Sequence, residues 1–222
     1  MVSGIEKLDY LLEINPDYNI VSAVNGVLVV DDWYKNFEEL QEFLYNAQPI
    51  AWYPVNEDYF DGKYYVVNSC RDFMDNRNYF KLKNEIVKLA KEKCNIDIDI
   101  FENGQLDFNY FTLKKEQKEE SQIQRPHQDN DDFGIVIYMD KISDGGTAVY
   151  DVEQKYKMIF NPEKEQAEEF KYSYKLKVNS KPNRLVFIDG RQLHGAYFDN
   201  INSYLQQWRI TQVYFANHKR EQ

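Results

Sequence analysis

The fold of this 222-residue chain is decided by the stretch RPHQDNDDFGIVIYM, residues 125–139. The run from Phe133 to Met139 is apolar and rich in β-branched side chains, which predicts a buried strand. Just before it, His127 and Asp129 stand two residues apart, so both would project from the same face of an extended segment. An isolated His-x-Asp pair occurs often by chance, and its surroundings decide whether it binds a metal.

Further short strands follow this pair and lead to another histidine. Residues 147–151 predict a strand after a Gly-Gly turn, and residues 183–189, NRLVFID, predict the next one. Beyond its end stands His194, one of only three histidines in the sequence. Two imidazoles and one carboxylate on one face of an octahedron are typical of a non-haem Fe(II) site with open positions for O2 and a co-substrate. We therefore predict His127, Asp129 and His194 as metal ligands.

The last predicted strand carries a cation on a face that is a candidate for burial. The stretch WRITQVYF, residues 208–215, places Arg209 and Thr211 on the same face as Val213 and Phe215. If that face points inward, the natural partner of the guanidinium is a carboxylate, bound through two parallel hydrogen bonds, and the Thr211 hydroxyl adds a third. The alternative is an ordinary solvent-facing charge at a strand edge.

The order of these motifs resembles that of the 2-oxoglutarate and Fe(II)-dependent dioxygenase superfamily, and is most similar to its prolyl-hydroxylase-like branch. The resemblance covers residues 105–217 and rests on His-x-Asp, Gly-Gly-Thr-Ala-x-Tyr, Asn-Arg-Leu-Val leading to His-Gly, and Arg-x-Thr. The opening VLVVDDW, residues 27–33, is also similar to the start of these enzymes.

The resemblance implies a role for each residue of the site. It implies that His127, Asp129 and His194 hold the iron. It also implies that Arg209 binds the distal carboxylate of 2-oxoglutarate and that Thr211 assists it. The co-substrates would be 2-oxoglutarate and O2, with ascorbate as a supporting reductant. The reaction would hydroxylate an amino acid, another small molecule or a protein side chain, with release of succinate and CO2.

Three further positions refine this resemblance. Tyr110 stands where relatives often place a tyrosine that hydrogen-bonds 2-oxoglutarate, and the alternative is a core aromatic in a chain with 18 tyrosines. Phe215 stands where nucleic-acid demethylases of the superfamily carry a second arginine. Asp129 keeps the carboxylate that related halogenases replace with a small residue, which favours hydroxylation.

A different class of function also accommodates these motifs. The chain could be a non-catalytic β-barrel that binds a metal or a small ligand, with an idle or structural triad. Arg209 discriminates between the two, because a binding module has no need for a buried carboxylate anchor opposite its metal.

The chain contains more acidic than basic residues. It has 27 Lys and Arg residues against 37 Asp and Glu residues, for a net charge of -10, which argues against nucleic acid and anionic membranes as partners. No run approaches the roughly 18 apolar residues of a membrane span, and the N-terminus shows no signal-peptide pattern. We expect a cytoplasmic protein with Cys70 and Cys94 as reduced thiols. The sequence leaves the oligomeric state open.

The predicted elements together indicate an α+β protein that is mainly β. We expect one domain over residues 1–222, with an N-terminal elaboration over 1–97 and a catalytic core over 98–217. Short strands separated by turns predict that the core is a double-stranded β-helix, a jelly-roll or cupin-like barrel. An insertion over about 153–180 interrupts the core, and it either covers the site or is a surface excursion.

Two helices and one strand are predicted in the N-terminal elaboration. Residues 25–31 predict the strand, and residues 36–45 predict a helix with Asn36 as its N-cap. A second helix, predicted over 79–93, would bury Phe80 together with aliphatic residues at helical spacing. We expect both helices to pack against one sheet of the barrel.

Several charged residues near the motifs have simpler interpretations beside the functional ones. Arg125 and Arg191 flank the two metal motifs and either contact an anionic group of the substrate or serve as surface charges. Asp131 and Asp132 are expected to be turn acids and not further ligands. His218 is expected in an exposed, frayed tail.

Overall fold

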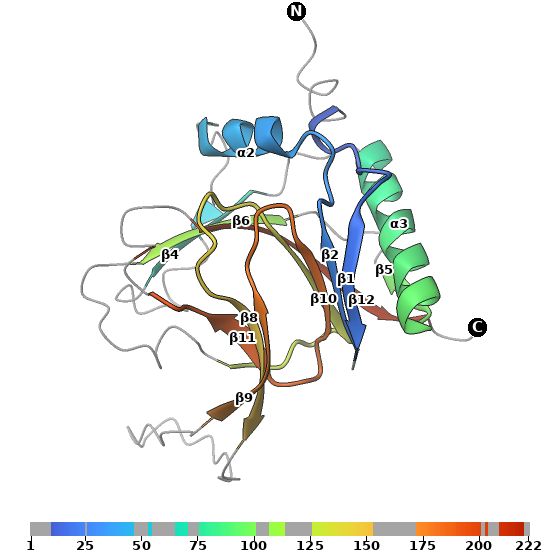
Figure 1. Cartoon of the computed structure of the whole chain (residues 1–222), viewed down its shortest axis with the longest axis vertical. Helices are drawn as coiled ribbons and strands as arrows, with labels where there is room; N and C mark the ends of the chain where they lie inside the picture. Colours follow the sequence, from blue (N-terminus) through green and yellow to red (C-terminus); the bar gives the residue numbers. More distant parts are fainter. Residues whose placement is uncertain are drawn as a thin grey trace, which may run out of the picture.

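The computed structural model describes residues 10–24, 26–46, 53–54, 65–70, 76–100, 107–113, 126–152, 172–200, 203 and 209–219, and its strands form two antiparallel sheets (Figure 1). In chain order the elements are β1 (Asn19–Val24), β2 (Val27–Asp31), α2 (Phe37–Asn46), β3 (Tyr53–Pro54), β4 (Tyr65–Cys70), α3 (Asn76–Cys94), β5 (Ile98–Ile100), β6 (Asp107–Leu113), β7 (Phe133–Tyr138), β8 (Gly146–Val152), β9 (Tyr172–Asn179), β10 (Leu185–Asp189), β11 (His194–Tyr197) and β12 (Arg209–His218). The fold is therefore mainly β, as the sequence predicts.

The larger sheet contains nine strands in the order β1-β2-β10-β7-β12-β6-β4-β3, with β5 paired to the end of β12. The smaller sheet has the order β11-β8-β9. An isolated antiparallel bridge between His127 and His194 adds the segment before β7 to this sheet beside β11. The strands predicted in the second half of the chain are confirmed as β7, β8, β10 and β12.

The larger sheet buries apolar side chains on both faces, because the residues of its central strands alternate between them. One set packs with the helices and includes Leu28, Val30, Ile135, Ile137, Leu185 and Phe187. The alternate set is directed toward the smaller sheet and includes Val27, Val29, Val136, Tyr138, Val186 and Ile188. We call these two surfaces the helix face and the inner face.

Both predicted helices cover the helix face. Figure 1 shows α3 alongside β1 and β2, and α2 across the end of the sheet. The helical residues that join this core are Leu40, Leu44, Leu82, Ile86, Leu89 and Ala90. The carbonyl of Asn36 accepts the first helical hydrogen bond of α2, from Leu40 N at 3.0 Å. Its side-chain amide, however, donates to the Tyr10 carbonyl at 2.7 Å, so this contact ties the helix start to the preceding chain.

The predicted burial of Phe80 is wrong. Its side chain is 50% exposed, whereas Leu82, Ile86 and Leu89 are buried. At about 100° per residue, Phe80 lies about 200° around α3 from Leu82, on the opposite side of the helix. An apolar residue within an amphipathic helix is therefore not necessarily part of its buried stripe.

An ion-pair cluster fixes β2 to the connection between β9 and β10. Asp31 accepts hydrogen bonds from Arg184 Nε at 2.6 Å, from Arg184 Nη2 at 3.1 Å and from Lys181 Nζ at 2.8 Å. Burial raises the pKa of Asp31, but the two cations outweigh burial and hold that pKa below its ordinary value. Next to this cluster Asn183, at φ 64°, bonds the main chain of Tyr34 at 2.7 and 2.8 Å. These contacts attach β2 and its partner β1 to the connection between β9 and β10.

The C-terminal end of β12 is ordered, so the expectation of a frayed tail at His218 is wrong. His218 is exposed, but its N–H donates to Asp132 Oδ2 at 3.0 Å, and its ring packs edge-on against Phe133 with centroids 4.8 Å apart. The neighbouring Asn217 donates from Nδ2 to Asp131 Oδ1 at 3.1 Å. The two acids therefore act as turn residues that hold β12, in agreement with the sequence.

Some predicted features lie outside the described residues. These are Arg125 and the part of the insertion over 153–171. The side chains of Cys70 and Tyr110 also lie outside them, although the backbone of each residue belongs to a strand.

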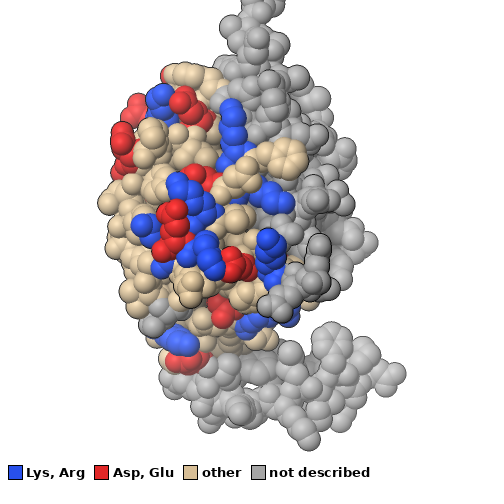
Figure 2. All heavy atoms as spheres, turned by 90° about the vertical axis from the view of Figure 1, so that its right-hand side faces the viewer, with Lys and Arg blue, Asp and Glu red and all other residues tan. Residues whose placement is uncertain are grey.

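The surface that carries α3 interleaves positive and negative side chains (Figure 2). Lys88 donates to Glu85 at 3.1 Å, and Lys91 pairs with Asp97. In the part of the chain that the structure describes, no helix combines the length and the apolar character that a membrane crossing requires.

Candidate metal centre

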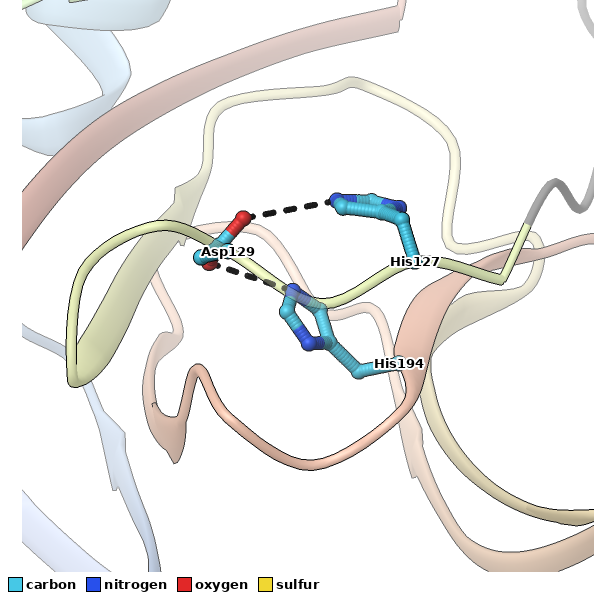
Figure 3. A group of neighbouring side chains, drawn as sticks. All are labelled: His127, Asp129 and His194. Atoms are coloured by element: carbon cyan, nitrogen blue, oxygen red, sulfur yellow. Dashed lines mark ion pairs between the residues drawn. The ribbon is translucent and has the colours of Figure 1, made fainter. Parts of the chain in front are cut away.

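The three predicted ligands converge at one end of the inner face (Figure 3). His127 and Asp129 come from the segment before β7, and His194 is the first residue of β11. His127 Nε2 lies 3.5 Å from Asp129 Oδ1, and His194 Nε2 lies 3.3 Å from Asp129 Oδ2. The candidate ligand atoms of the three residues all lie within 4.8 Å of one another.

Backbone pairing places the two histidines side by side. His127 N donates to the His194 carbonyl at 2.8 Å, and His194 N donates to the His127 carbonyl at 2.9 Å. Their ring centroids are 4.7 Å apart. Nδ1 of His194 lies 2.9 Å from the carbonyl of Gln192, which can only accept, so this nitrogen carries the proton. Nε2 is then the nitrogen that would coordinate a bound metal, whereas in the metal-free site a protonated imidazole can donate from Nε2 to Asp129.

Asp129 is held by its own backbone and is kept ionised by the histidines. Its N–H donates to the carbonyl of Gly190 at 2.8 Å. Burial would raise the pKa of the Asp129 carboxyl, but hydrogen bonds and charge from His127 and His194 outweigh burial and hold that pKa well below its ordinary value. The carboxylate is therefore available as an anionic ligand at neutral pH.

The three donors fit one divalent cation. With metal–ligand bonds near 2.1 Å, neighbouring ligand atoms lie about 3.0 Å apart in an octahedron and about 3.4 Å apart in a tetrahedron. The separation of 3.3 Å between His194 Nε2 and Asp129 Oδ2 falls within this range, and that of 3.5 Å between His127 Nε2 and Asp129 Oδ1 lies just above it. Among the described residues this group offers three ligands, which would leave at least one coordination position for another molecule, whereas a structural zinc site is closed by four. Such a donor set is compatible with a reactive metal site.

The site opens to solvent on the side of His127. The side chain of His127 is 58% exposed, whereas those of Asp129 and His194 are 12% and 8% exposed. The side-chain amide of Gln128 donates to the carbonyl of Arg191, which attaches the ligand segment to the connection between β10 and β11. A molecule that approaches the metal from solvent would therefore pass His127.

A buried cation lies farther along the same inner face. Arg209 is 3% exposed, and its guanidinium carbon lies 5.8 Å from the ring centroid of Tyr138 and 5.2 Å from that of Phe198. Its Nη2 donates to the carbonyl of Gly146 at 3.3 Å. Thr211, on the same side of β12, is also buried. The expectation that this side points inward therefore holds at the start of β12.

The burial of that side ends halfway along the strand. Val213 is half-buried and Phe215 is exposed, so burial on this side declines from Arg209 toward the end of β12.

Strand register relates Arg209 to the metal ligands. In the pairing of β8 with β11, Gly146 lies opposite Tyr197 and Val149 lies opposite His194. Gly146, which Arg209 contacts, is three residues from Val149, or about 10 Å along the strand. A small anion held by Arg209 would thus lie where the two sheets meet, about 10 Å along β8 from the level of His194.

The structure places the backbone of Tyr110 and the whole of Arg191. Tyr110 pairs with Ile210 in the ladder between β6 and β12, next to Arg209, but its side chain lies outside the described residues. Arg191 is 57% exposed, and its Nε donates to Asp132 Oδ1 at 3.1 Å. Its guanidinium is therefore engaged by a turn acid at the surface.

Sequence reasoning missed the residues that surround Arg209. The hydroxyl of Tyr138 lies 2.5 Å from Thr147 Oγ1, so a hydrogen bond joins the two sheets beside the guanidinium. Phe198 follows β11 and lies over the guanidinium. A signal existed for Tyr138, because the alternation of β7 puts it on the same face as Val136. Phe198 follows a strand only four residues long, and the sequence carries no pattern that would direct it to Arg209.

Comparisons with known proteins find similarity only among solved structures. No protein-family model matches this sequence, and no curated protein matches it. A non-haem α-ketoglutarate-dependent epimerase, SnoN from nogalamycin biosynthesis, has 14% identity and a TM-score of 0.49, over 88% of this chain and 82% of its own. An oxidoreductase of the 2OG-Fe(II) oxygenase family from Burkholderia pseudomallei has 10% identity and a TM-score of 0.49, over 88% and 89%.

A third structure is more distant. TqaL, an Fe(II)/α-ketoglutarate-dependent dioxygenase, has 11% identity and a TM-score of 0.37, over 84% of this chain and 76% of its own. Two of these three neighbours are thus Fe(II)- and 2-oxoglutarate-dependent oxygenases, and the third is an α-ketoglutarate-dependent epimerase. At such identities and TM-scores they assign neither a family nor an activity to this chain.

Proposed function

We propose that this protein is an Fe(II)- and 2-oxoglutarate-dependent oxygenase that hydroxylates its substrate. The observation that carries the proposal is Arg209, which is buried on the wall formed by the larger sheet and donates to Gly146 of the facing smaller sheet, about 10 Å along β8 from the residue paired with His194. A guanidinium on such a wall is suited to bind a carboxylate through two parallel hydrogen bonds. A five-carbon dicarboxylate would reach from the metal to this anchor.

Each residue of the site would have one role. His127, Asp129 and His194 would hold Fe(II), which supplies the oxidising chemistry that couples O2 and 2-oxoglutarate to hydroxylation, with succinate and CO2 as products. Arg209 would bind the distal carboxylate, and Thr211 would donate a further hydrogen bond to it. The apolar inner face would exclude water from the co-substrate.

The charges of this arrangement support 2-oxoglutarate in particular. A divalent cation, the Asp129 carboxylate and the Arg209 guanidinium sum to two positive charges when both imidazoles are neutral. The two carboxylates of 2-oxoglutarate would neutralise them, which matters because unbalanced charge is unfavourable in a buried site. The hydrogen bond from His194 Nδ1 to the Gln192 carbonyl places the proton of a neutral imidazole on Nδ1 and would leave Nε2 for the metal.

We propose in addition that the barrel is a double-stranded β-helix of the prolyl-hydroxylase-like branch. The strand order β6-β12-β7-β10 in the larger sheet, and His127-β11-β8-β9 in the smaller one, support this winding. Along the chain from β6 onward, successive strands then pass repeatedly from one sheet to the other, as in jelly-roll relatives.

The prime substrate would be an amino acid, another small molecule or a protein side chain that enters past His127. A non-catalytic barrel that binds a metal or a ligand is the alternative function. The burial of Arg209 favours the oxygenase, because a binding module needs no carboxylate anchor near its metal.

Succinate release tests the proposal. The protein is incubated with Fe(II), 2-oxoglutarate and ascorbate in air, and succinate is expected above the level of a metal-free control and of a His194→Ala variant. Binding of 2-oxoglutarate to the Mn(II) form, measured by calorimetry without O2, does not depend on the prime substrate. The absence of both succinate and binding would rule the oxygenase out.

A further inference from the structure

At one end of the inner face, a glycine lies within β7 and another directly follows β10. Toward the metal ligands, β7 presents Val136 and then Gly134, while β10 presents Ile188, and the next position of the same alternation is Gly190. Gly134 and Ile188 are directly paired between the strands. Large side chains therefore give way to glycine on both strands at the point where the metal site begins.

The carboxylate of Asp129 fills the space that these glycines leave. A Cβ atom at Gly134 would lie 3.1 Å from Asp129 Oδ2, and one at Gly190 would lie 3.2 Å from both Oδ2 and Cβ of Asp129. The opposite oxygen, Oδ1, is the one that approaches His127, and Oδ2 also approaches His194. The ligand carboxylate is thus enclosed between two glycines and two imidazoles.

Backbone conformation does not explain the two glycines. Neither has the positive φ that occurs at Gly26, Gly145 and Gly146. Alanine could adopt the same strand conformation at position 134, and replacing a glycine by alanine in a compatible conformation normally stabilises a protein. At position 134 the free space beside Asp129 is therefore the property that glycine supplies, whereas at position 190 glycine also avoids the main-chain oxygen of Asp131.

We propose that Gly134 and Gly190 are positioning residues that keep open the pocket for the Asp129 carboxylate and thereby determine the affinity for the metal. This inference rests on the metal site of the proposed function. A methyl group at position 134 would displace Oδ2 from His194 Nε2, now 3.3 Å away. Because the Asp129 N–H is bonded to the Gly190 carbonyl, the backbone cannot follow without losing that bond.

Titration of the metal-free protein with Mn(II), followed by electron paramagnetic resonance of the free ion, tests the proposal. Gly134→Ala is expected to weaken Mn(II) binding roughly tenfold or more, while its melting temperature without metal equals or exceeds that of the wild type. Gly190→Ala should weaken binding further, since its Cβ would also lie 2.7 Å from the main-chain oxygen of Asp131.

A matched control adds a methyl group elsewhere on the same face. Val136→Ile lies two positions along β7 and should retain the Mn(II) affinity of the wild type. Unchanged affinity in a folded Gly134→Ala protein would overturn the proposal. A wild type that binds no Mn(II) would overturn the metal site itself and this proposal with it.

A second variant covers the case in which Gly134→Ala does not fold. The double variant Asp129→Ala/Gly134→Ala removes the carboxylate that the new methyl group would meet. Recovery of the melting temperature to that of Asp129→Ala supports the proposal, and failure to recover overturns it.

Discussion

The helix face and the inner face of the larger sheet are built from the same strands but contribute differently. On the helix face, Ile135, Phe187 and Ile210 pack with apolar side chains of α2 and α3. On the inner face, alternate positions of these strands present Tyr138 and Arg209. Apolar burial stabilises the fold, whereas buried polar groups lose hydration and stabilise it less. Stability and binding can therefore be changed separately by substituting alternate residues of one strand.

The largest effect is expected on the helix face, for Phe187→Ala. Phe187 is 1% exposed and stacks on Phe133 with ring centroids 5.0 Å apart. Removal of this side chain should lower the free energy of unfolding by about 4 kcal/mol, because it leaves a cavity in the core. Urea denaturation measures this loss. The folded variant should still bind Mn(II) like the wild type, and a weakened affinity would show that the faces are not independent.

The converse is expected on the inner face, for Arg209→Met. This variant should lose about 100-fold in 2-oxoglutarate affinity, or about 2.7 kcal/mol, because the charged hydrogen bonds to the distal carboxylate are lost. Its free energy of unfolding should be unchanged or higher, since methionine buries no charge. Calorimetry of the Mn(II) form and urea denaturation measure the two quantities. Retained binding with lower stability would make Arg209 a structural residue.

An intermediate effect is expected for Asp31, which attaches β2 to the connection between β9 and β10. Asp31→Asn should lower the free energy of unfolding at pH 7 by about 2 kcal/mol, since it weakens charged hydrogen bonds from Arg184 and Lys181.

The pKa of Asp31 in the folded protein lies below its ordinary value, so the contribution of Asp31 to stability is present above about pH 4. That contribution is lost as the pH falls through the folded pKa. Denaturation at several pH values should therefore show the difference between wild type and variant shrinking in acid, and a constant difference would contradict this assignment.

The smallest effect is expected for Arg191→Ala, the matched control for Arg209. Arg191 is exposed and paired with Asp132 at the surface, and exposed ion pairs typically contribute less than about 1 kcal/mol. The 2-oxoglutarate affinity of this variant should stay within about twofold of that of the wild type, since the Arg191–Asp132 ion pair is at the surface and does not contact the inner face. A large loss of affinity would mean that Arg209 is not the specific anchor. Once a substrate is known, unchanged substrate affinity in this variant would also exclude Arg191 from the substrate site.

Local patterns in the sequence were sufficient for the two helices, for β2, β7, β8, β10 and β12, and for selecting the candidate ligands that the fold brings together. The apolar run from Phe133 predicted β7, and the spacing of His127 and Asp129 predicted a shared face. The prediction for Phe80 was wrong because its apolar character alone does not show on which side of the helix it lies. The glycines beside Asp129 were missed because their role depends on how close two strands and a loop approach one another.

The sequence by itself determined which residue types are present and how they alternate, because strand and helix periodicities are local properties of the chain. That is why the histidines, Asp129 and the arginine of the last strand could be singled out. Only the tertiary structure decided which alternate face points inward, that the carbonyl of Gly146 meets Arg209, and that Gly134 and Gly190 make room for the carboxylate. These facts depend on contacts between strands distant in sequence, and such contacts are set by packing of the whole chain.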